Sequence, residues 1–136
     1  HDLKHVTKAD RTKPSIDPAD PVQATVDEYR RNMEVIVKKL QSTGAKLIFA
    51  TTTPVTPGTT NPLREVDAPG RYNAAALEIM KASGIAVDDL FALSEPQLGI
   101  WQLPRNVHFK PEGSSALARQ VATTIEAALP AKLPAP

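Results

Sequence analysis

Cysteine is absent from this chain of 136 residues. Its absence excludes a disulfide framework, a zinc site built from thiolates and a cysteine nucleophile. A chain without cysteine suits the cytosol and the periplasm equally, so the compartment stays open, with a slight preference for a secreted or periplasmic location. The length allows one modest hydrophobic core, which predicts a single domain or most of one.

Long apolar runs and a dominant charge are also missing. No run approaches the roughly 20 residues of a membrane helix, and the first residues are polar rather than signal-like. Lysine and arginine number 16 against 15 acidic residues, so no charge field argues for nucleic acid or a membrane as a partner. The absence of a glycine-rich phosphate loop removes nucleotide chemistry.

Amphipathic patterns alternate with short apolar runs in the rest of the chain. Residues 1–20 are polar and carry prolines, which predicts a loop. Asp20 as N-cap and Pro21 at the first helical position predict a helix that runs to about Ser42. Residues 47–52 fit a strand buried on both faces. The proline-rich segment 54–70 then forms a loop at the carboxyl end of that strand, where open α/β sheets place their binding sites.

A second helix contains Tyr72 and Met80, and Gly84 ends it before a second buried strand at 85–87. The last helix begins near Pro111 and carries apolar residues at every fourth position up to Leu129. This order predicts α/β architecture with parallel strands. Two strands do not make a stable sheet, so an upstream segment that supplies more strands is expected.

His108 is the strongest candidate for catalysis. It lies between a loop and the predicted helix at Pro111, where a side chain can project over the edge of the sheet. An imidazole there can take a proton from a serine hydroxyl and return it to the leaving alcohol. A histidine that only packs a surface loop is the alternative.

The residues around His108 resemble the closing catalytic block of the SGNH (GDSL-type) ester hydrolases, which has the form Asp-x-x-His and is often followed by Phe and a glycine-containing helix start. Val107, Phe109 and Gly113 match that form. Other features that look like the family, in the same order, are Tyr29 with Asn32, the strand end 49–55, the helix start Tyr72-Asn73 and the strand end 87–90. The resemblance covers about residues 1–128.

This resemblance implies a three-layer α/β/α sandwich around a parallel sheet, with flavodoxin-like topology, that is incomplete in this chain. Residues 1–20 are then a loop after the family's third conserved block, 21–129 the C-terminal part of one domain, and 130–136 a mobile tail. The nucleophilic serine lies on an upstream segment that the chain lacks.

One position departs from the family's pattern. The residue three places before the histidine is Arg105, where the family has aspartate. Arginine can neither hold the imidazole tautomer nor stabilise an imidazolium. A backbone carbonyl, Asp88, Asp89 or Glu95 can take over this role, or the site is weakened or inactive.

His1-Asp2 resembles the third block of family members that carry Gly-Leu-His-Asp. The resemblance implies that the ring N–H of His1 donates to the oxyanion and that Asp2 is a structural aspartate beside it. The alternative is a chain end without a role. His1, Asp2 and His5 also resemble a fragment of a zinc-binding helix, but the fragment lacks a glutamate and a third ligand, so no metal site is expected.

None of the six serines stands in a Gly-Asp-Ser or Gly-x-Ser-x-Gly context after a strand. They are Ser15, Ser42, Ser83, Ser94, Ser114 and Ser115. We therefore expect none of them to be the nucleophile, and we expect the chain by itself to be inactive on esters and poorly stable.

The sequence thus predicts part of a serine hydrolase that acts on acyl esters, such as O-acetyl groups of carbohydrates, without a metal or organic cofactor. Its expected partners are the complementary N-terminal segment and a small ester; a nicked or two-chain protein is compatible with this reading. A non-catalytic module of the same fold that binds carbohydrate or a protein is the alternative. A hydrogen-bonded His108 that faces an open cleft favours the enzyme.

Overall fold

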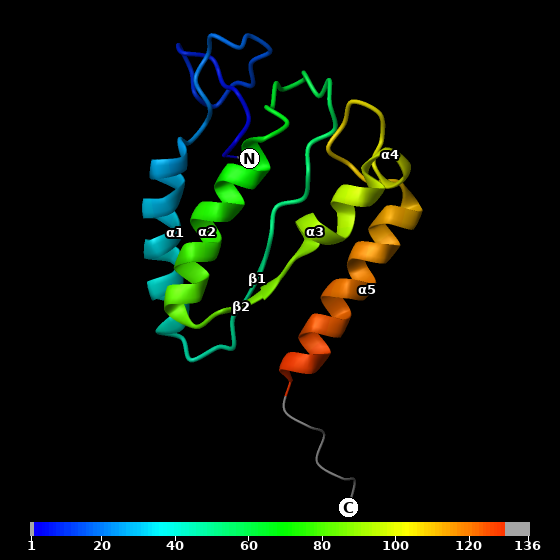
Figure 1. The fold of residues 1–136 in the computed structure, drawn as a ribbon. Coiled ribbons are helices and arrows are strands. Elements are labelled where there is room, and N and C mark those ends of the chain that lie inside the picture. The colour runs from blue at the N-terminus through cyan, green and yellow to red at the C-terminus, as the bar shows by residue number, and fades with distance from the viewer. Residues whose placement is uncertain (1, 130–136) are drawn as a thin grey trace, which may run out of the picture.

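The computed structural model describes residues 2–129. Helices α1 (Val26–Gln41) and α2 (Ala68–Ser83) form one layer, the strands β1 (Ile48–Ala50) and β2 (Ala86–Asp88) the middle, and α5 (Pro111–Ala128) the other side (Figure 1). Between β2 and α5 lie three short helices: α3 (Leu90–Ser94), η1 (Glu95–Gln97) and α4 (Leu98–Trp101). The three-layer α/β class is confirmed.

The two strands are parallel, with Ile48 opposite Ala86 and Ala50 opposite Asp88. This confirms the predicted parallel pairing. The prediction that the strands are buried is wrong, because Ala50, Ala86 and Val87 are exposed. Within residues 2–129 the sheet has only these two strands, so too few neighbours cover its faces.

Helix α1 starts later than the sequence predicts. Its N-cap is Thr25, which forms a capping box with Glu28, and not Asp20. Residues 20–24 are instead paired with the N-terminal segment: the Ala24 N–H donates to the Asp2 carbonyl at 3.0 Å, and neighbouring residues continue this pattern. Hydrogen bonds to a distant segment therefore replace the first helical turn.

The other helix boundaries follow local signals. Helix α2 ends at Gly84, whose positive φ of 64° suits glycine, and α5 begins at Pro111, as predicted. Helix α2 begins at Ala68, inside the segment expected to be a loop, with proline in its first turn. Helices α3 and α4 were not expected from the sequence. The Asp89 carboxylate caps α3 by accepting from a backbone N–H.

The core beneath the carboxyl end of β1 joins three parts of the chain. Leu3, Val55 and Tyr72 are buried in one cluster with Ala68. The Tyr72 hydroxyl donates to the Ala24 carbonyl, and its ring meets that of Tyr29 edge to face at 5.2 Å. This packing holds the N-terminal segment, the loop after β1 and the start of α2 together.

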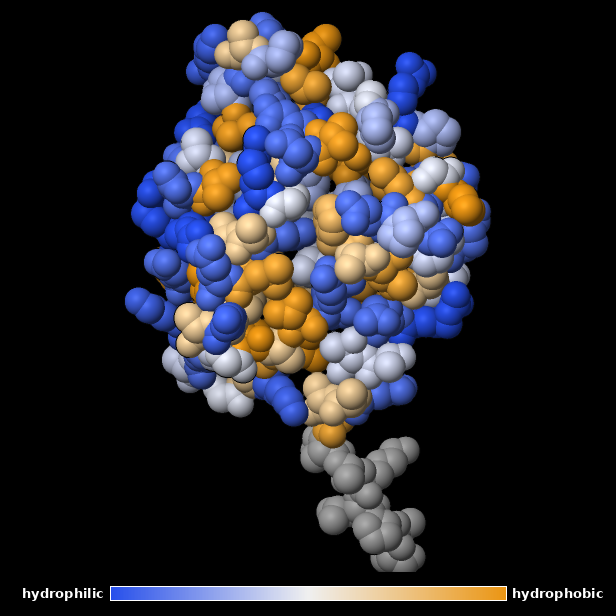
Figure 2. Space-filling model, viewed as in Figure 1, coloured by the Kyte–Doolittle hydropathy of each residue, from blue (hydrophilic) through white to orange (hydrophobic). Residues whose placement is uncertain are grey.

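A large apolar surface lies at the opposite end of the strands. Figure 2 shows hydrophobic residues gathered where Figure 1 places β1 and β2. On α1, Val35 is 66% and Ile36 50% exposed. A hollow of about 90 Å³ nearby is lined by Met33, Ile36, Val37, Leu40, Leu47, Ile48, Phe49, Met80 and Ile85.

No helix among residues 2–129 has the length and hydrophobicity to cross a membrane.

Candidate active site

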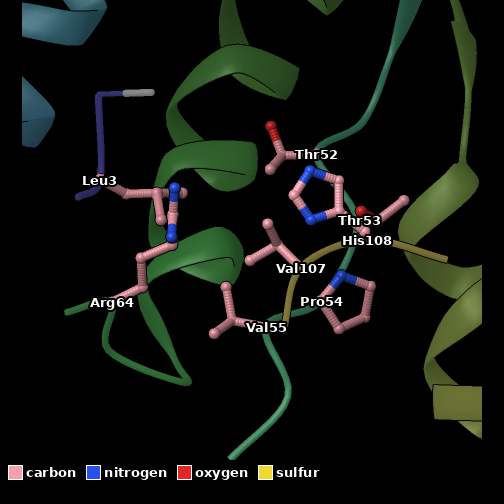
Figure 3. A pocket seen from close by; sticks show the side chains of 8 residues that line it. All are labelled: Leu3, Thr52, Thr53, Pro54, Val55, Arg64, Val107 and His108. Atoms are coloured by element: carbon pink, nitrogen blue, oxygen red, sulfur yellow. The ribbon is translucent and has the colours of Figure 1, made fainter. Parts of the chain in front are cut away.

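A cleft of about 340 Å³ opens at the carboxyl end of β1 (Figure 3). This is the place that the sequence predicts for a binding site, at the loop that follows the strand. Its lining residues come from the N-terminal segment, the segments on either side of the 56–63 loop and the loop before α5. They are Leu3, Thr52, Thr53, Pro54, Val55, Arg64, Val107 and His108.

His108 projects from a loop whose two ends are tied together. The Lys110 N–H donates to the Trp101 carbonyl at 2.7 Å, and the Leu103 N–H donates to the His108 carbonyl at 2.9 Å. These bonds make residues 101–110 a closed loop. They place the histidine on its cleft-facing side, immediately before α5.

Gln102 fastens this loop to the strand end. Its side chain is 2% exposed, and its Nε2 donates to the Pro54 carbonyl at 2.8 Å. Its Oε1 accepts from the Thr56 hydroxyl, which also lies 3.1 Å from the Asn106 carbonyl oxygen. A buried amide with both groups satisfied rigidifies a site. The sequence carries no signal for this role, since glutamine is common on protein surfaces.

Asn106 sets the tautomer of His108. Its Oδ1 accepts the backbone N–H of His108 at 3.0 Å, which identifies this atom as the amide oxygen because a backbone N–H can only donate. The same Oδ1 lies 2.6 Å from Nδ1 of His108. Nδ1 therefore carries the proton, and Nε2 has its lone pair free. This is the tautomer that a general base needs.

The group that contacts Nδ1 is thus none of the candidates named from the sequence. Asp88 is buried and accepts from Gln120, and Asp89 accepts from the Thr51 hydroxyl. No hydrogen bond joins Glu95 to His108 within the described chain. From charge alone, a carboxylate is expected to accept the Nδ1–H of His108. Instead, the side chain of an asparagine two residues earlier in the chain accepts it.

Arg105 is turned away from this contact. It adopts a positive φ of 52°, and its side chain packs against Gly58, where a Cβ would lie 3.1 Å from it. A left-handed conformation costs a residue other than glycine about 1 kcal/mol or more. The Arg105 side chain therefore lies against the 56–63 loop.

The N-terminal candidates lie beside the cleft or outside the described residues. His1 is outside them. Asp2 is half-buried next to Leu3, which lines the cleft. Burial, and then the charge of Asp2, raises the pKa of both Tyr29 and Tyr72. Asp2 is therefore electrostatically coupled to the core below the cleft.

His5 has a structural environment. It is 4% exposed, its Nδ1 lies 2.7 Å from the Asp20 carbonyl oxygen, and its Nε2 lies 3.8 Å from a Glu65 oxygen. Residues 4–6 form isolated extended bridges, so the segment that resembles a fragment of a zinc-binding helix is not helical at His5. Among residues 2–129 no three histidine, aspartate or glutamate side chains gather in a way that would hold a metal ion.

The lining of the cleft includes threonines but no serine among the described residues. The Ser15 hydroxyl donates to Asp20 and the Ser94 hydroxyl to the Leu90 carbonyl, both at 2.6 Å, so these two have structural partners. Ser114 and Ser115 lie in the first turns of α5. The expectation that none of the chain's six serines is the nucleophile stays a prediction.

Asn73 secures the β1 end of the cleft. Its Oδ1 accepts the Thr52 N–H and its Nδ2 donates to the Thr52 carbonyl, each at 2.8 Å. The side chain is buried within the first turns of α2. It replaces the sheet partner that the strand loses where it leaves the sheet, and so it fixes the backbone that lines the cleft.

Comparison with known proteins gives structural likeness only. No protein-family model matches the chain, and no curated protein matches it in sequence. It is similar to the lipase/acylhydrolase from Enterococcus faecalis, with a TM-score of 0.69 and 22% identity over 81% of this chain and 56% of that one.

Two further solved structures are similar. LAE5, an α/β hydrolase enzyme from the metagenome of Lake Arreo in Spain, gives a TM-score of 0.61 and 14% identity over 79% of this chain and 50% of that one. A protein from Lactobacillus plantarum gives a TM-score of 0.59 and 13% identity over 80% of this chain and 56% of that one. The chain therefore shares its fold with these three solved structures, and it spans about half of their length.

Proposed function

We propose that this chain is the C-terminal part of an SGNH/GDSL-type serine ester hydrolase in which His108 is the general base. One observation carries the proposal. An exposed imidazole stands on a cleft at the carboxyl end of a parallel strand, with Nδ1–H donating to Asn106 and Nε2 free. The lipase/acylhydrolase fold and the motif around His108 support the same reaction class.

The chemistry follows from this tautomer. Nε2 of His108 takes the proton of a serine hydroxyl as the serine oxygen bonds to the ester carbonyl carbon. The imidazolium then protonates the leaving alkoxide as the ester C–O bond breaks. A water molecule repeats the sequence on the acyl-serine, releasing the acid and restoring the serine. Asn106 keeps the imidazole ring of His108 oriented throughout. It stabilises the imidazolium with the dipole of a neutral amide, whereas a carboxylate would do so with a full negative charge.

We assign the serine to an upstream segment that packs on the apolar surface at the strands. The exposed side chains of α1 and the hollow beside β1 form a face that an additional strand and helix would cover. The similar structures are about twice as long as the part that aligns. In this assembly His1 supplies an oxyanion donor, and Asp2 is the structural aspartate beside it, with its backbone carbonyl accepting from the Ala24 N–H.

The substrate in this proposal is a small acyl ester, with O-acetyl groups of carbohydrates as the preferred class. The cleft volume of about 340 Å³ is near the lower end of the range for ligand pockets. No step of the reaction requires a metal or an organic cofactor.

The test is hydrolysis of 4-nitrophenyl acetate by the chain alone and by the protein that contains the upstream segment. We expect no turnover from the chain, and turnover from the longer protein that His108→Ala abolishes. Because His108 is exposed, added imidazole is expected to restore part of the lost rate. Hydrolysis by the chain alone that His108→Ala abolishes would refute the assignment of the serine.

A second function, a non-catalytic module that binds carbohydrate or a partner protein, is favoured by one observation. The ring of His108 has a neutral amide partner, and no serine lines the cleft among residues 2–129. For this function, the longer protein would bind acetylated sugars without hydrolysing them. Mass spectrometry of the sugar after incubation separates the two functions.

A further inference from the structure

Arg64 stands across the cleft from His108. In Figure 3 the guanidinium lies beside Leu3 on one wall and the imidazole lies on the other. The apolar side chains of Val55 and Val107 lie between them. A ligand that spans this cleft therefore meets a cation at one end and a base at the other.

The charge of Arg64 is poorly compensated. The residue is half-buried, and its one side-chain hydrogen bond within residues 2–129 runs from Nη1 to the Pro62 carbonyl at 3.3 Å. The adjacent Glu65 is paired with Arg71 and approaches His5 at 3.8 Å. No carboxylate of the described chain forms an ion pair with Arg64.

The backbone holds this cation in place. The Arg64 N–H donates to the Thr59 carbonyl at 3.3 Å, and Arg64 pairs with Lys4 in an antiparallel bridge. Burial lowers the pKa of Arg64, which is the sign of a charge that has lost water without gaining an anion. Desolvating a cation without a partner is unfavourable. Such an arrangement suits a site that receives its anion from a ligand.

We propose that Arg64 binds a carboxylate of the substrate while His108 acts at the ester. The planar guanidinium matches a carboxylate with two parallel hydrogen bonds, and most of its five donors are unused. The preferred substrate is then an acyl ester that carries a carboxylate, either on the sugar, as in an acetylated uronic acid, or on the acyl group. This inference rests on the proposed function and names its substrate class.

Binding is measured first, because it needs no nucleophile. The chain is titrated with methyl glucuronoside and with methyl glucoside, which differ by a carboxylate in place of a hydroxymethyl group, and shifts of the His108 ring signals are followed by NMR. Monomethyl succinate and methyl butyrate form the second pair, for a carboxylate on the acyl group. We expect at least one anionic probe to bind about tenfold more tightly than its neutral counterpart.

Three variants test the assignment to Arg64. Arg64→Met keeps the length of the side chain and removes its charge, so the preference for the anion is expected to disappear. Arg64→Lys keeps the charge but not the planar fork, and is expected to retain part of the preference. Arg119→Met removes an exposed arginine of α5 that does not line the cleft, and is expected to leave the preference unchanged.

The outcomes separate this inference from the proposed function. Equal affinity for both members of each pair, or an anion preference that survives in Arg64→Met, overturns the carboxylate site. If the preference is present and the longer protein hydrolyses no ester, the carboxylate site stands and the esterase fails. If the longer protein hydrolyses neutral and anionic esters equally well, the esterase stands and the substrate class fails. The pair of probes that shows the preference for the anion identifies the part of the ester that carries the carboxylate.

Discussion

Gly113 decides how closely α5 approaches the loop that carries His108. A Cβ at this position would lie 2.6 Å from Trp101 Cβ and 2.9 Å from the Trp101 carbonyl oxygen. That oxygen also accepts from the Lys110 N–H, which closes the loop. Gly113→Ala therefore pushes on the backbone that positions the histidine.

The expected magnitude comes from two opposed effects. Alanine favours a helix over glycine by up to about 1 kcal/mol. Overpacking of a closely packed site costs about 1–3 kcal/mol, and here the clash includes a backbone atom that cannot rotate away. We expect Gly113→Ala to lower the free energy of unfolding by about 1–2 kcal/mol.

Gly70 provides a matched control, because it is the third residue of α2 as Gly113 is the third residue of α5. No atom lies within 4 Å of a Cβ at position 70. Gly70→Ala is therefore expected to be neutral or stabilising by up to about 1 kcal/mol. The two variants share the same helix propensity change and differ only in the space available.

Urea unfolding followed by tryptophan fluorescence measures both variants, since Trp101 is the only tryptophan and touches Gly113. A Gly113→Ala protein as stable as Gly70→Ala, with the native emission of Trp101 unchanged, would refute the close approach of α5 to the loop. The measurement is made on the longest form of the protein that folds.

The remaining predictions concern hydrogen bonds. Tyr72→Phe leaves the Ala24 carbonyl without its donor and should cost about 1–3 kcal/mol in urea unfolding, against a smaller loss in Tyr29→Phe. Burial raises the pKa of Tyr72 above its usual value of 10. The neutral hydroxyl therefore contributes its full stability below pH 10, and this contribution is lost as the pH rises through the pKa of Tyr72 in the folded protein. Alkaline unfolding should be less steep in Tyr72→Phe. Hydrogen bonds from Thr25 lower the pKa of Glu28 below its usual value of 4.5. Their contribution to stability is therefore present above pH 4.5 and is lost as the pH falls through the pKa of Glu28 in the folded protein. Glu28→Gln should remove this loss of stability in acid. In the active protein, Asn106→Ala should lower kcat at least about tenfold with little change in KM, and Asn106→Asp should retain activity; equal loss in both would argue against orientation of His108 by this residue.

The sequence alone was sufficient for the elements whose signals are local. The proline at the start of α5 and the glycine after α2 act on the backbone within one turn, so these boundaries agree with the structure. The start of α1 was wrong for the opposite reason. Asp20 and Pro21 are a good local helix signal, but pairing with the N-terminal segment takes their backbone groups.

The burial of the strands depends on what surrounds them. An apolar run indicates that a segment can be buried, and the layers that pack on it determine whether it is. Val87 is 39% exposed because the described chain supplies only two strands and a few helices to cover them. The surface that remains open is the strongest structural support for an upstream partner segment.

In the candidate site, too, some features follow from local sequence and others from contacts between distant segments. The sequence predicts His108 as a site residue because the motif around it is continuous, and the structure places this residue on the cleft. The sequence does not predict its tautomer, because Asn106 reaches it only in a loop that Gln102 fastens to the end of β1. Arg64 lies far from His108 along the chain, and only the folded backbone places the two on opposite walls of one cleft. Local propensities determine the helices and strands, whereas contacts between distant segments determine which side chains meet at the site.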